Sequence, residues 1–200
     1  ETGRAIALAA AERLIPCTLE LGGKDPVVVL EGADVRRAAR VAVNGAFWNA
    51  GQVCTSLERA YVESAVYDEF IDEAVRATEA LRVGSSADAD VGAMTVQSQL
   101  EHVDRQVRDA VDRGARVLAG GRADPSGRYY LPTLVVDVSH AMDIMRSETF
   151  GPVLPVMRVR DADEALRLAN DSGFALGASV WGREAEARRF ADGLRAGMVC

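Results

Sequence analysis

Hydrophobic positions change their period several times along the chain, which predicts alternating strands and helices. The continuous apolar run Pro26–Leu30 is typical of a strand that is covered on both faces. Asp34 follows it as a good helix N-cap, and apolar residues recur at helical spacing from Val35 to Ala46. By the same criteria we expect strands at 18–21, 59–63, 115–119, 129–138, 154–159, 178–181 and 198–200, and helices at 4–13, about 65–81, about 97–113, 161–170 and 184–195. The alternation predicts an α/β fold with a mostly parallel open sheet and helices on both faces.

Length and composition favour one domain over residues 1–200. Hydrophobic residues make up 48% of the 200 positions, and a chain of this size buries roughly 70% of the surface that it exposes when unfolded. The sequence contains no internal repeat, low-complexity segment or linker. We therefore expect a single core.

The charge balance argues against polyanionic partners. There are 30 acidic and 23 basic residues, so the net charge is −7, and the basic residues are scattered along the chain. Nucleic acid and anionic membrane surfaces are therefore not expected as partners. Since no apolar run approaches the roughly 20 residues of a membrane span, and no leader pattern opens the sequence, we expect a cytoplasmic protein.

Cysteine and histidine usage argues against a disulfide framework and against a metal site. The three cysteines are Cys17, Cys54 and Cys200, an odd number without Cys-x-x-Cys spacing, and the two histidines are His102 and His140. We expect reduced thiols and no bound metal. Cys17 and Cys200 are interpreted as ordinary thiols, and His102, which lies off the apolar stripe of its helix, as a solvated side chain.

Three short runs bring together residue types that can do chemistry. Gly51-Gln52-Val53-Cys54 places a thiol just after the end of a helix, and Leu19-Glu20-Leu21-Gly22-Gly23-Lys24 places a carboxylate 34 positions earlier (54 − 20). A third run, Glu148-Thr149-Phe150-Gly151-Pro152, follows downstream. Alone, each signal is weak, because a lone Cys is usually a small core residue and a lone Glu is usually solvated.

Taken together, in this order and at this spacing, the three runs resemble the aldehyde dehydrogenase superfamily. That family has its general base in a Leu-Glu-Leu-Gly-Gly-Lys run, its nucleophile in a Gly-Gln-x-Cys run and a cofactor contact in a Glu-x-Phe-Gly-Pro run. The resemblance covers nearly the whole chain, from Glu1–Arg4 to Ala196–Val199. Since the family's chains are more than twice as long, the resemblance predicts that residues 1–200 are a catalytic domain, with the cofactor-binding half and the final oligomerisation strands absent.

The resemblance also implies roles for individual residues. Cys54 would attack an aldehyde to form a thiohemiacetal, which passes a hydride to NAD or NADP and leaves a thioester. Glu20 would be the general base that activates water to hydrolyse this thioester, which favours the acid-producing branch over the CoA-acylating one. Glu148 would bind ribose hydroxyls of the cofactor, and Phe150 would contact its nicotinamide half. Lys24 and Asn49 are assigned structural roles.

The resemblance further implies a small-molecule aldehyde as substrate and a homo-oligomeric full-length enzyme. One oxyanion donor would be the backbone N–H of Cys54, and the second would come from the upstream half. The isolated 200 residues are therefore expected to show negligible hydride transfer. Two other interpretations remain open: an inactive fragment or interaction module that keeps the fold, and a thiol-dependent esterase that uses Cys54 without any nicotinamide.

Overall fold

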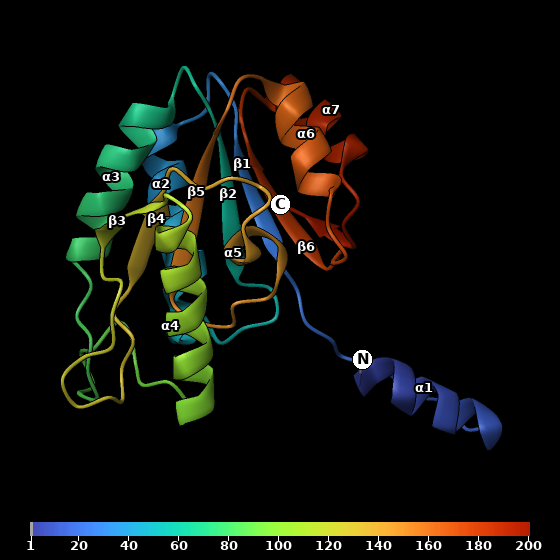
Figure 1. Ribbon diagram of the computed structural model, residues 1–200. Coiled ribbons are helices and arrows are strands. Elements are labelled where there is room, and N and C mark those ends of the chain that lie inside the picture. Colours follow the sequence, from blue (N-terminus) through green and yellow to red (C-terminus); the bar gives the residue numbers. More distant parts are fainter. Residues whose placement is uncertain (1) are drawn as a thin grey trace.

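Residues 2–200, which the computed structural model describes, form a seven-stranded sheet flanked by helices (Figure 1). The strands are β1 (Asp25–Val29), β2 (Leu57–Glu63), β3 (Arg116–Ala119), β4 (Thr133–Val136), β5 (Val153–Val159), β6 (Gly177–Trp181) and β7 (Met198–Val199). The helices are α1 (Thr2–Glu12), α2 (Val35–Phe47), α3 (Tyr67–Glu79), α4 (Gln97–Asp112), α5 (Asp143–Arg146), α6 (Ala162–Asn170) and α7 (Glu184–Gly193), with a 3₁₀ turn η1 at Trp48–Gly51.

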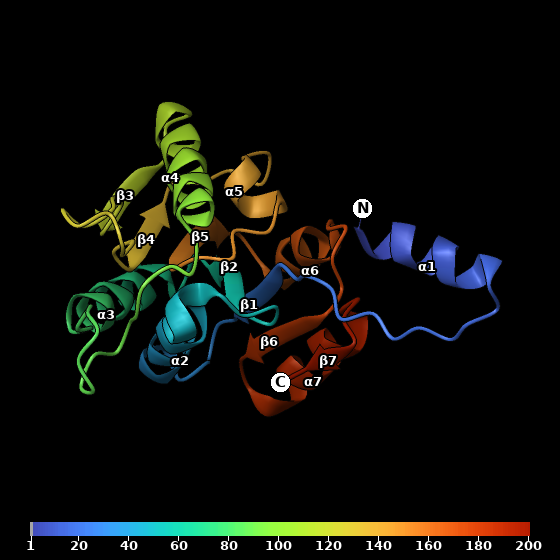
Figure 2. The same ribbon diagram turned by 90° about the horizontal axis from the view of Figure 1, so that it is seen from below.

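The sheet confirms the predicted α/β fold. Its strand order is β3-β4-β5-β2-β1-β6-β7, and each neighbouring pair is parallel except β3 and β4. Helices α2 and α3 cover one face, and α4, α5 and α6 lie on the other (Figure 2). Helix α7 packs beside α6 and β6.

The centre of the sheet is buried from both sides, as its continuous apolar run predicts. Val27, Val28 and Val29 of β1 are fully buried. The inward face of α2 consists largely of alanines, whose small side chains let the helix lie close to the strands. The Oδ1 atom of Asp34 accepts the backbone N–H of Arg37 at 3.1 Å, which confirms the predicted N-cap.

Several predicted boundaries are wrong for reasons of pairing. Residues 18–21 form no strand and pair with none of the strands of the sheet; they belong to an irregular stretch at residues 15–24. The extended run predicted at 129–138 narrows to β4, where the N–H of Thr133 bonds to the carbonyl of Pro152 at 2.9 Å. The helix expected at 161–170 is confirmed as α6, with Asp161 as its N-cap: Oδ1 of Asp161 accepts the N–H of Glu164, and the carboxylate of Glu164 accepts the N–H of Arg160.

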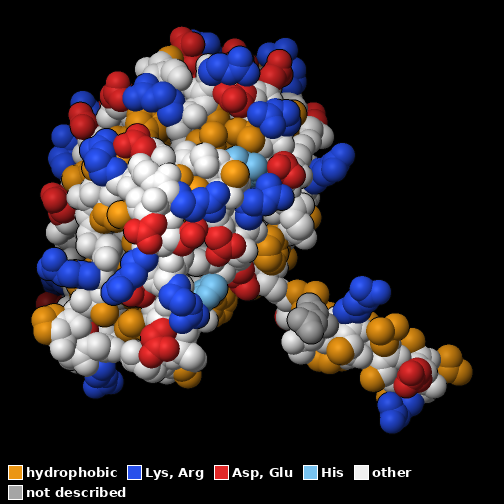
Figure 3. All heavy atoms as spheres, viewed as in Figure 1, with side chains coloured by type: hydrophobic (Ala, Val, Ile, Leu, Met, Phe, Trp, Pro, Cys, Tyr) orange, Lys and Arg blue, Asp and Glu red, His pale blue; other side chains and the backbone are white. Residues whose placement is uncertain are grey.

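Helix α1 projects away from the body and joins it through an irregular connection (Figure 1). Apolar side chains are visible on this projecting segment (Figure 3), and the exposed ones include Ile6, Leu8, Leu14 and Ile15. Within residues 2–200, no helix has the length and apolar character that crossing a membrane requires.

Candidate active site

The three sequence runs converge because each one directly precedes a parallel strand. Gly23-Lys24 leads into β1, Cys54 precedes β2, and Glu148-Thr149-Phe150 precedes β5. Strands β5, β2 and β1 are adjacent and parallel, so their amino ends meet at one edge of the sheet. Segments that lie up to 125 residues apart in sequence are thereby brought into contact.

Two glycines allow these segments to touch through their backbones. A Cβ atom at Gly23 would overlap the carbonyl oxygen of Cys54, and one at Gly51 would overlap the carbonyl of Gly151. Gly51 also has a φ of +68°, a left-handed conformation that glycine adopts without steric cost. The Cys54 segment is therefore in direct contact with both of the other runs.

Cys54 lies half-buried in a turn between η1 and β2, in the connection where the sequence places it. Asn49 and Ala50, just before it, have left-handed φ values of 52° and 56°. The side chain of Gln52 holds this loop from outside: its Nε2 donates to the carbonyl of Ala93 at 3.2 Å, and its Oε1 accepts the N–H of Thr95 at 2.8 Å. The thiol is thus carried by a loop with fixed geometry.

Glu148 is bonded on two sides. Its Oε1 accepts the backbone N–H of Gly23 at 3.0 Å, and its carbonyl accepts from Nε2 of His102 at 3.2 Å. The prediction that His102 is simply solvated is therefore wrong, since the ring is half-buried and bonded to the loop. Glu148, Phe150, His102 and Gln99 line a shallow depression of about 380 Å³.

A buried ion pair lies beneath this loop. Nζ of Lys24 is 2.9 Å from Oε2 of Glu58, and both side chains are almost fully buried. Burial lowers the pKa of Lys24, and the negative charge of Glu58 opposes that shift. The sequence predicts only a structural role for Lys24 and gives no sign of the part played by Glu58. The one available signal was that Lys24 is the only lysine in an arginine-rich chain.

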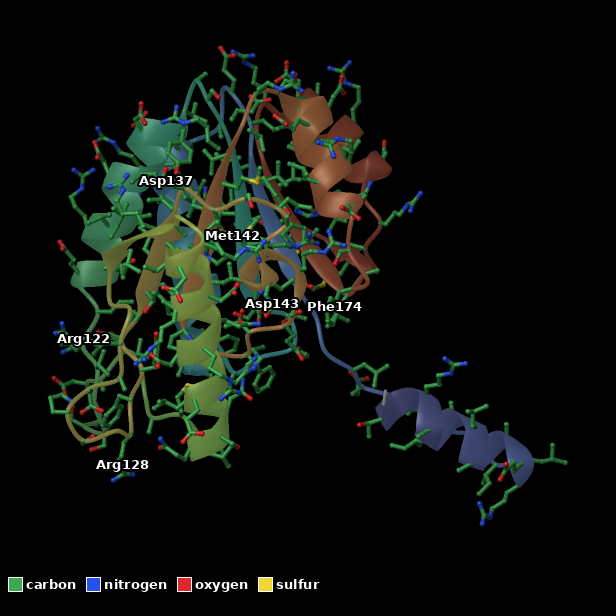
Figure 4. All side chains as sticks on the ribbon, in the orientation of Figure 1. Arg122, Arg128, Asp137, Met142, Asp143 and Phe174 are labelled. Atoms are coloured by element: carbon green, nitrogen blue, oxygen red, sulfur yellow. The ribbon has the colours of Figure 1, made fainter. Side chains whose placement is uncertain are left out.

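Arg59, the next residue along β2, connects the site to helix α6. Its Nε donates to the carbonyl of Lys24 at 2.7 Å, and Nη2 donates to the carbonyl of Ala169 at 2.9 Å. A cation is well placed there, because carbonyls at a helix carboxyl end carry partial negative charge. Asp143, at the start of α5 and labelled in Figure 4, accepts a hydrogen bond from Nε2 of Gln106 of α4 at 3.0 Å.

Glu20 is exposed and belongs to the irregular connection that leads to Gly23. Its expected position at a strand end is therefore wrong, and its role as general base stays a prediction. Phe150 is half-buried and has a φ of 47°.

Comparison with known proteins agrees with this arrangement. The sequence model of the Aldehyde dehydrogenase family matches residues 1–200. The chain is 44% identical over 198 residues to the 4,4'-diapolycopene aldehyde oxidase of a Methylomonas species, covering 98% of this chain and 37% of the relative. It is 41% identical over 203 residues to a putative NADP(+) succinate-semialdehyde dehydrogenase of Mycobacterium bovis, covering 99% of this chain and 39% of the relative.

A solved structure shows the same fold. The lactaldehyde dehydrogenase from Escherichia coli superimposes with a TM-score of 0.94 at 39% identity, covering 98% of this chain and 42% of that one. The chain therefore belongs to the aldehyde dehydrogenase family, and it spans about two fifths of the length of the relatives that it matches.

Proposed function

We propose that residues 1–200 form the catalytic domain of an enzyme that oxidises an aldehyde to a carboxylic acid with NAD or NADP. The observation that carries this proposal is the convergence of three runs at the amino ends of β1, β2 and β5, where Glu148 bonds to Gly23 and Gly23 packs against Cys54. Family membership supports aldehyde oxidation as the reaction class.

Cys54 is the nucleophile in this proposal. An aldehyde carbon does not lose hydride readily, because it lacks an oxyanion to expel it. Attack by the Cys54 thiolate forms a carbon–sulfur bond and moves the carbonyl electron pair onto oxygen. The backbone N–H of Cys54 is a candidate donor to that oxygen, and such donors contribute about 10²–10³ in rate. Collapse of the adduct releases hydride with its electron pair and leaves a thioester on Cys54.

Glu20 then acts as the general base. It takes a proton from water as the water oxygen adds to the thioester carbon, and the sulfur leaves as a thiolate while the carboxylic acid is released. Its exposed position in a connection without regular structure is compatible with access to water. This chemistry needs a reduced Cys54 thiol, and the reducing conditions of the cytoplasm, where we place the enzyme, would keep it so.

The loop before β5 fits a nicotinamide nucleotide. The depression there is lined by a carboxylate, Glu148, which can accept from ribose hydroxyls, and by the ring of Phe150, which can contact the nicotinamide half. When bound, the nucleotide accepts the hydride. The name of the Mycobacterium bovis relative includes NADP(+), which supports a dinucleotide of this type.

A graft tests the proposal in a complete enzyme. Residues 1–200 would replace the matching 42% of the Escherichia coli lactaldehyde dehydrogenase, and aldehyde-dependent reduction of NAD and NADP would be measured. We expect activity that Cys54→Ala abolishes and that the matched thiol variant Cys17→Ala leaves intact. Activity that survives Cys54→Ala would overturn the assignment of the nucleophile. The 200-residue chain by itself should reduce neither nucleotide. Substantial reduction would contradict the proposal that hydride transfer needs segments outside residues 1–200.

A thiol-dependent esterase is the second candidate, because the nucleophile and the proposed base both belong to this chain. It predicts that the 200-residue chain hydrolyses p-nitrophenyl acetate without any nucleotide. Mass spectrometry should then show an acetyl group on Cys54, and hydrolysis that persists in Cys54→Ala would eliminate this reading.

A further inference from the structure

Glu58 makes contacts that its pairing with a lysine does not require. In addition to Lys24, its carboxylate accepts two successive backbone N–H groups: Oε2 accepts that of Thr149 and Oε1 that of Phe150, both at 2.7 Å. The side chain is almost fully buried at the amino end of β2, whereas Thr149 and Phe150 lie about 90 residues downstream. Charge-assisted hydrogen bonds of this length are among the stronger ones in proteins.

The backbone that Glu58 holds has an uncommon conformation. Phe150 has a φ of 47°, a left-handed value that costs a non-glycine residue free energy. Successive N–H groups that point to one side around such a residue form a concave binding place for an anion. In this chain the carboxylate of Glu58 occupies that place, so its two hydrogen bonds help to offset the cost of the turn.

Lys24 holds the same loop through a side chain. Its Nζ donates to Oγ1 of Thr149 at 2.8 Å and to Oε2 of Glu58 at 2.9 Å. Gly23, next to it in sequence, donates its N–H to the carboxylate of Glu148. Residues 148, 149 and 150 are therefore each held by a separate contact from residues that precede or begin β1 and β2.

A simpler explanation is that Glu58 only neutralises the buried charge of Lys24. That role needs one oxygen close to Nζ, and it does not explain why both oxygens also accept backbone N–H groups from the same loop. The two explanations differ in what happens when both charges are removed together.

We propose that Glu58 is a positioning residue, whose carboxylate fixes the backbone of Thr149 and Phe150 so that Glu148 and Phe150 meet the nicotinamide nucleotide in a set geometry. The effect of Glu58 on nucleotide binding rests on the proposed function. Its effect on the backbone of Thr149 and Phe150 involves only residues of this chain and can be tested without any cofactor.

The first experiment measures amide hydrogen exchange at Thr149 and Phe150 in the 200-residue chain. Lys24→Met removes the cation but keeps both acceptor oxygens, and the double variant Lys24→Met with Glu58→Met also removes the oxygens while leaving no unpaired charge. Protection is compared with that of the Val27 and Val28 amides of β1, which report any loss of global stability. Relative to them, we expect the two amides to keep their protection in Lys24→Met and to exchange at least about tenfold faster in the double variant, since both lose their acceptor. Exchange in the double variant equal to wild type would show that Glu58 only balances charge and would overturn the proposal.

A matched control lies on the same strand. Oε2 of Glu63, at the opposite end of β2, accepts the N–H of Glu31 at 2.6 Å. Glu63→Met should therefore speed exchange at Glu31 and leave Thr149 and Phe150 unchanged. A general loosening of the fold would instead raise exchange at both ends of β2 in either variant.

The second experiment uses the graft into the lactaldehyde dehydrogenase. The double variant should raise the KM for NAD or NADP at least about tenfold, while acetylation of Cys54 by p-nitrophenyl acetate, which needs no nucleotide, stays within about twofold of the parent. Faster exchange with an unchanged KM would overturn the link to the nucleotide. If the parent graft oxidises no aldehyde, the proposed function fails, while the exchange data still decide whether Glu58 positions the loop.

Discussion

The backbone of Gly23 packs directly against the carbonyl oxygen of Cys54, so that the connection before β1 shapes the turn that carries the thiol. Gly23 also donates its N–H to Glu148, so one residue contacts the segments that precede both β2 and β5. Its missing side chain is therefore a condition for the assembly of the site.

Gly23→Ala should displace the Cys54 turn, because the new methyl group would overlap a backbone oxygen that cannot rotate away. A displacement of about 1 Å can cost on the order of 10² in rate, so we expect a loss of that size in acetylation of Cys54 by p-nitrophenyl acetate. Gly92→Ala is the control, since a Cβ atom there would meet open space. Equal acetylation rates in the two variants would show that the contact does not set the position of the thiol.

Lys24→Met should destabilise the chain by about 3–5 kcal/mol, because it leaves the buried carboxylate of Glu58 without its cation. Urea unfolding would measure this loss, and adding Glu58→Met should recover part of it. Arg36→Met, which breaks an exposed pair with Glu69, should leave the unfolding midpoint unchanged. A loss below about 1 kcal/mol for Lys24→Met would indicate that water reaches the pair.

His140 should make the stability depend on pH. Burial lowers the pKa of His140, and the hydrogen bond and charge of Asp171 only partly oppose that shift. The ring also faces the hydroxyl of Tyr61 and, beyond Asp171, the guanidinium of Arg146. Because the folded state binds this proton less readily than the unfolded state, its contribution is complete above about pH 6.5 and declines as the pH falls below that value.

Urea unfolding of wild type and His140→Gln between about pH 7.5 and pH 5.5 would check this sign. The difference in free energy of unfolding between the two proteins should shrink as the pH falls. A difference that grows on acidification would mean that the charged ring is the form favoured by the fold.

Glu20→Gln should slow release of the acyl group from Cys54 by about 10²–10⁴, since the amide cannot take a proton from water. Its stability should match wild type because the side chain is exposed. Mass spectrometry of the acetylated chain over time would measure the release. Glu12→Gln, another exposed carboxylate, is the control, and equal release from both variants would remove Glu20 from the mechanism.

The fold was largely predictable, because its signals are local. The apolar run of β1, the N-cap Asp34 and the alanine face of α2 each depend on residues close in sequence, and each is confirmed. The expected strand at residues 18–21 is absent from the structure, where these residues belong to an irregular stretch. A strand needs a partner strand, and the apolar character of a segment does not show whether a partner lies beside it. Val111 shows the same limit on a helix, since it fits the apolar spacing of α4 but is 44% exposed.

In the candidate site, only the residues inside the three sequence runs could be predicted. Cys54, Glu148 and Phe150 could be selected because their runs resemble a family, whereas Glu58 lies outside those runs and resembles any charged residue at the start of a strand. Its importance comes from contacts with Lys24, 34 residues away, and with Thr149, 91 residues away. Composition and periodicity carry no information on contacts at such separations.

The alternation of Glu58 and Arg59 on β2 has a consequence for strand pairing. One side chain bonds to the Lys24 ammonium, and the other to carbonyl oxygens at the end of α6. If β2 slid by one residue in one direction, the guanidinium of Arg59 would face the ammonium, and a slip in the other direction would bring the carboxylate of Glu58 to the carbonyl oxygens. Either slip would thus place like charges or partial charges together at one of the two sites, even though valine, alanine and tyrosine side chains could fill either face of the sheet.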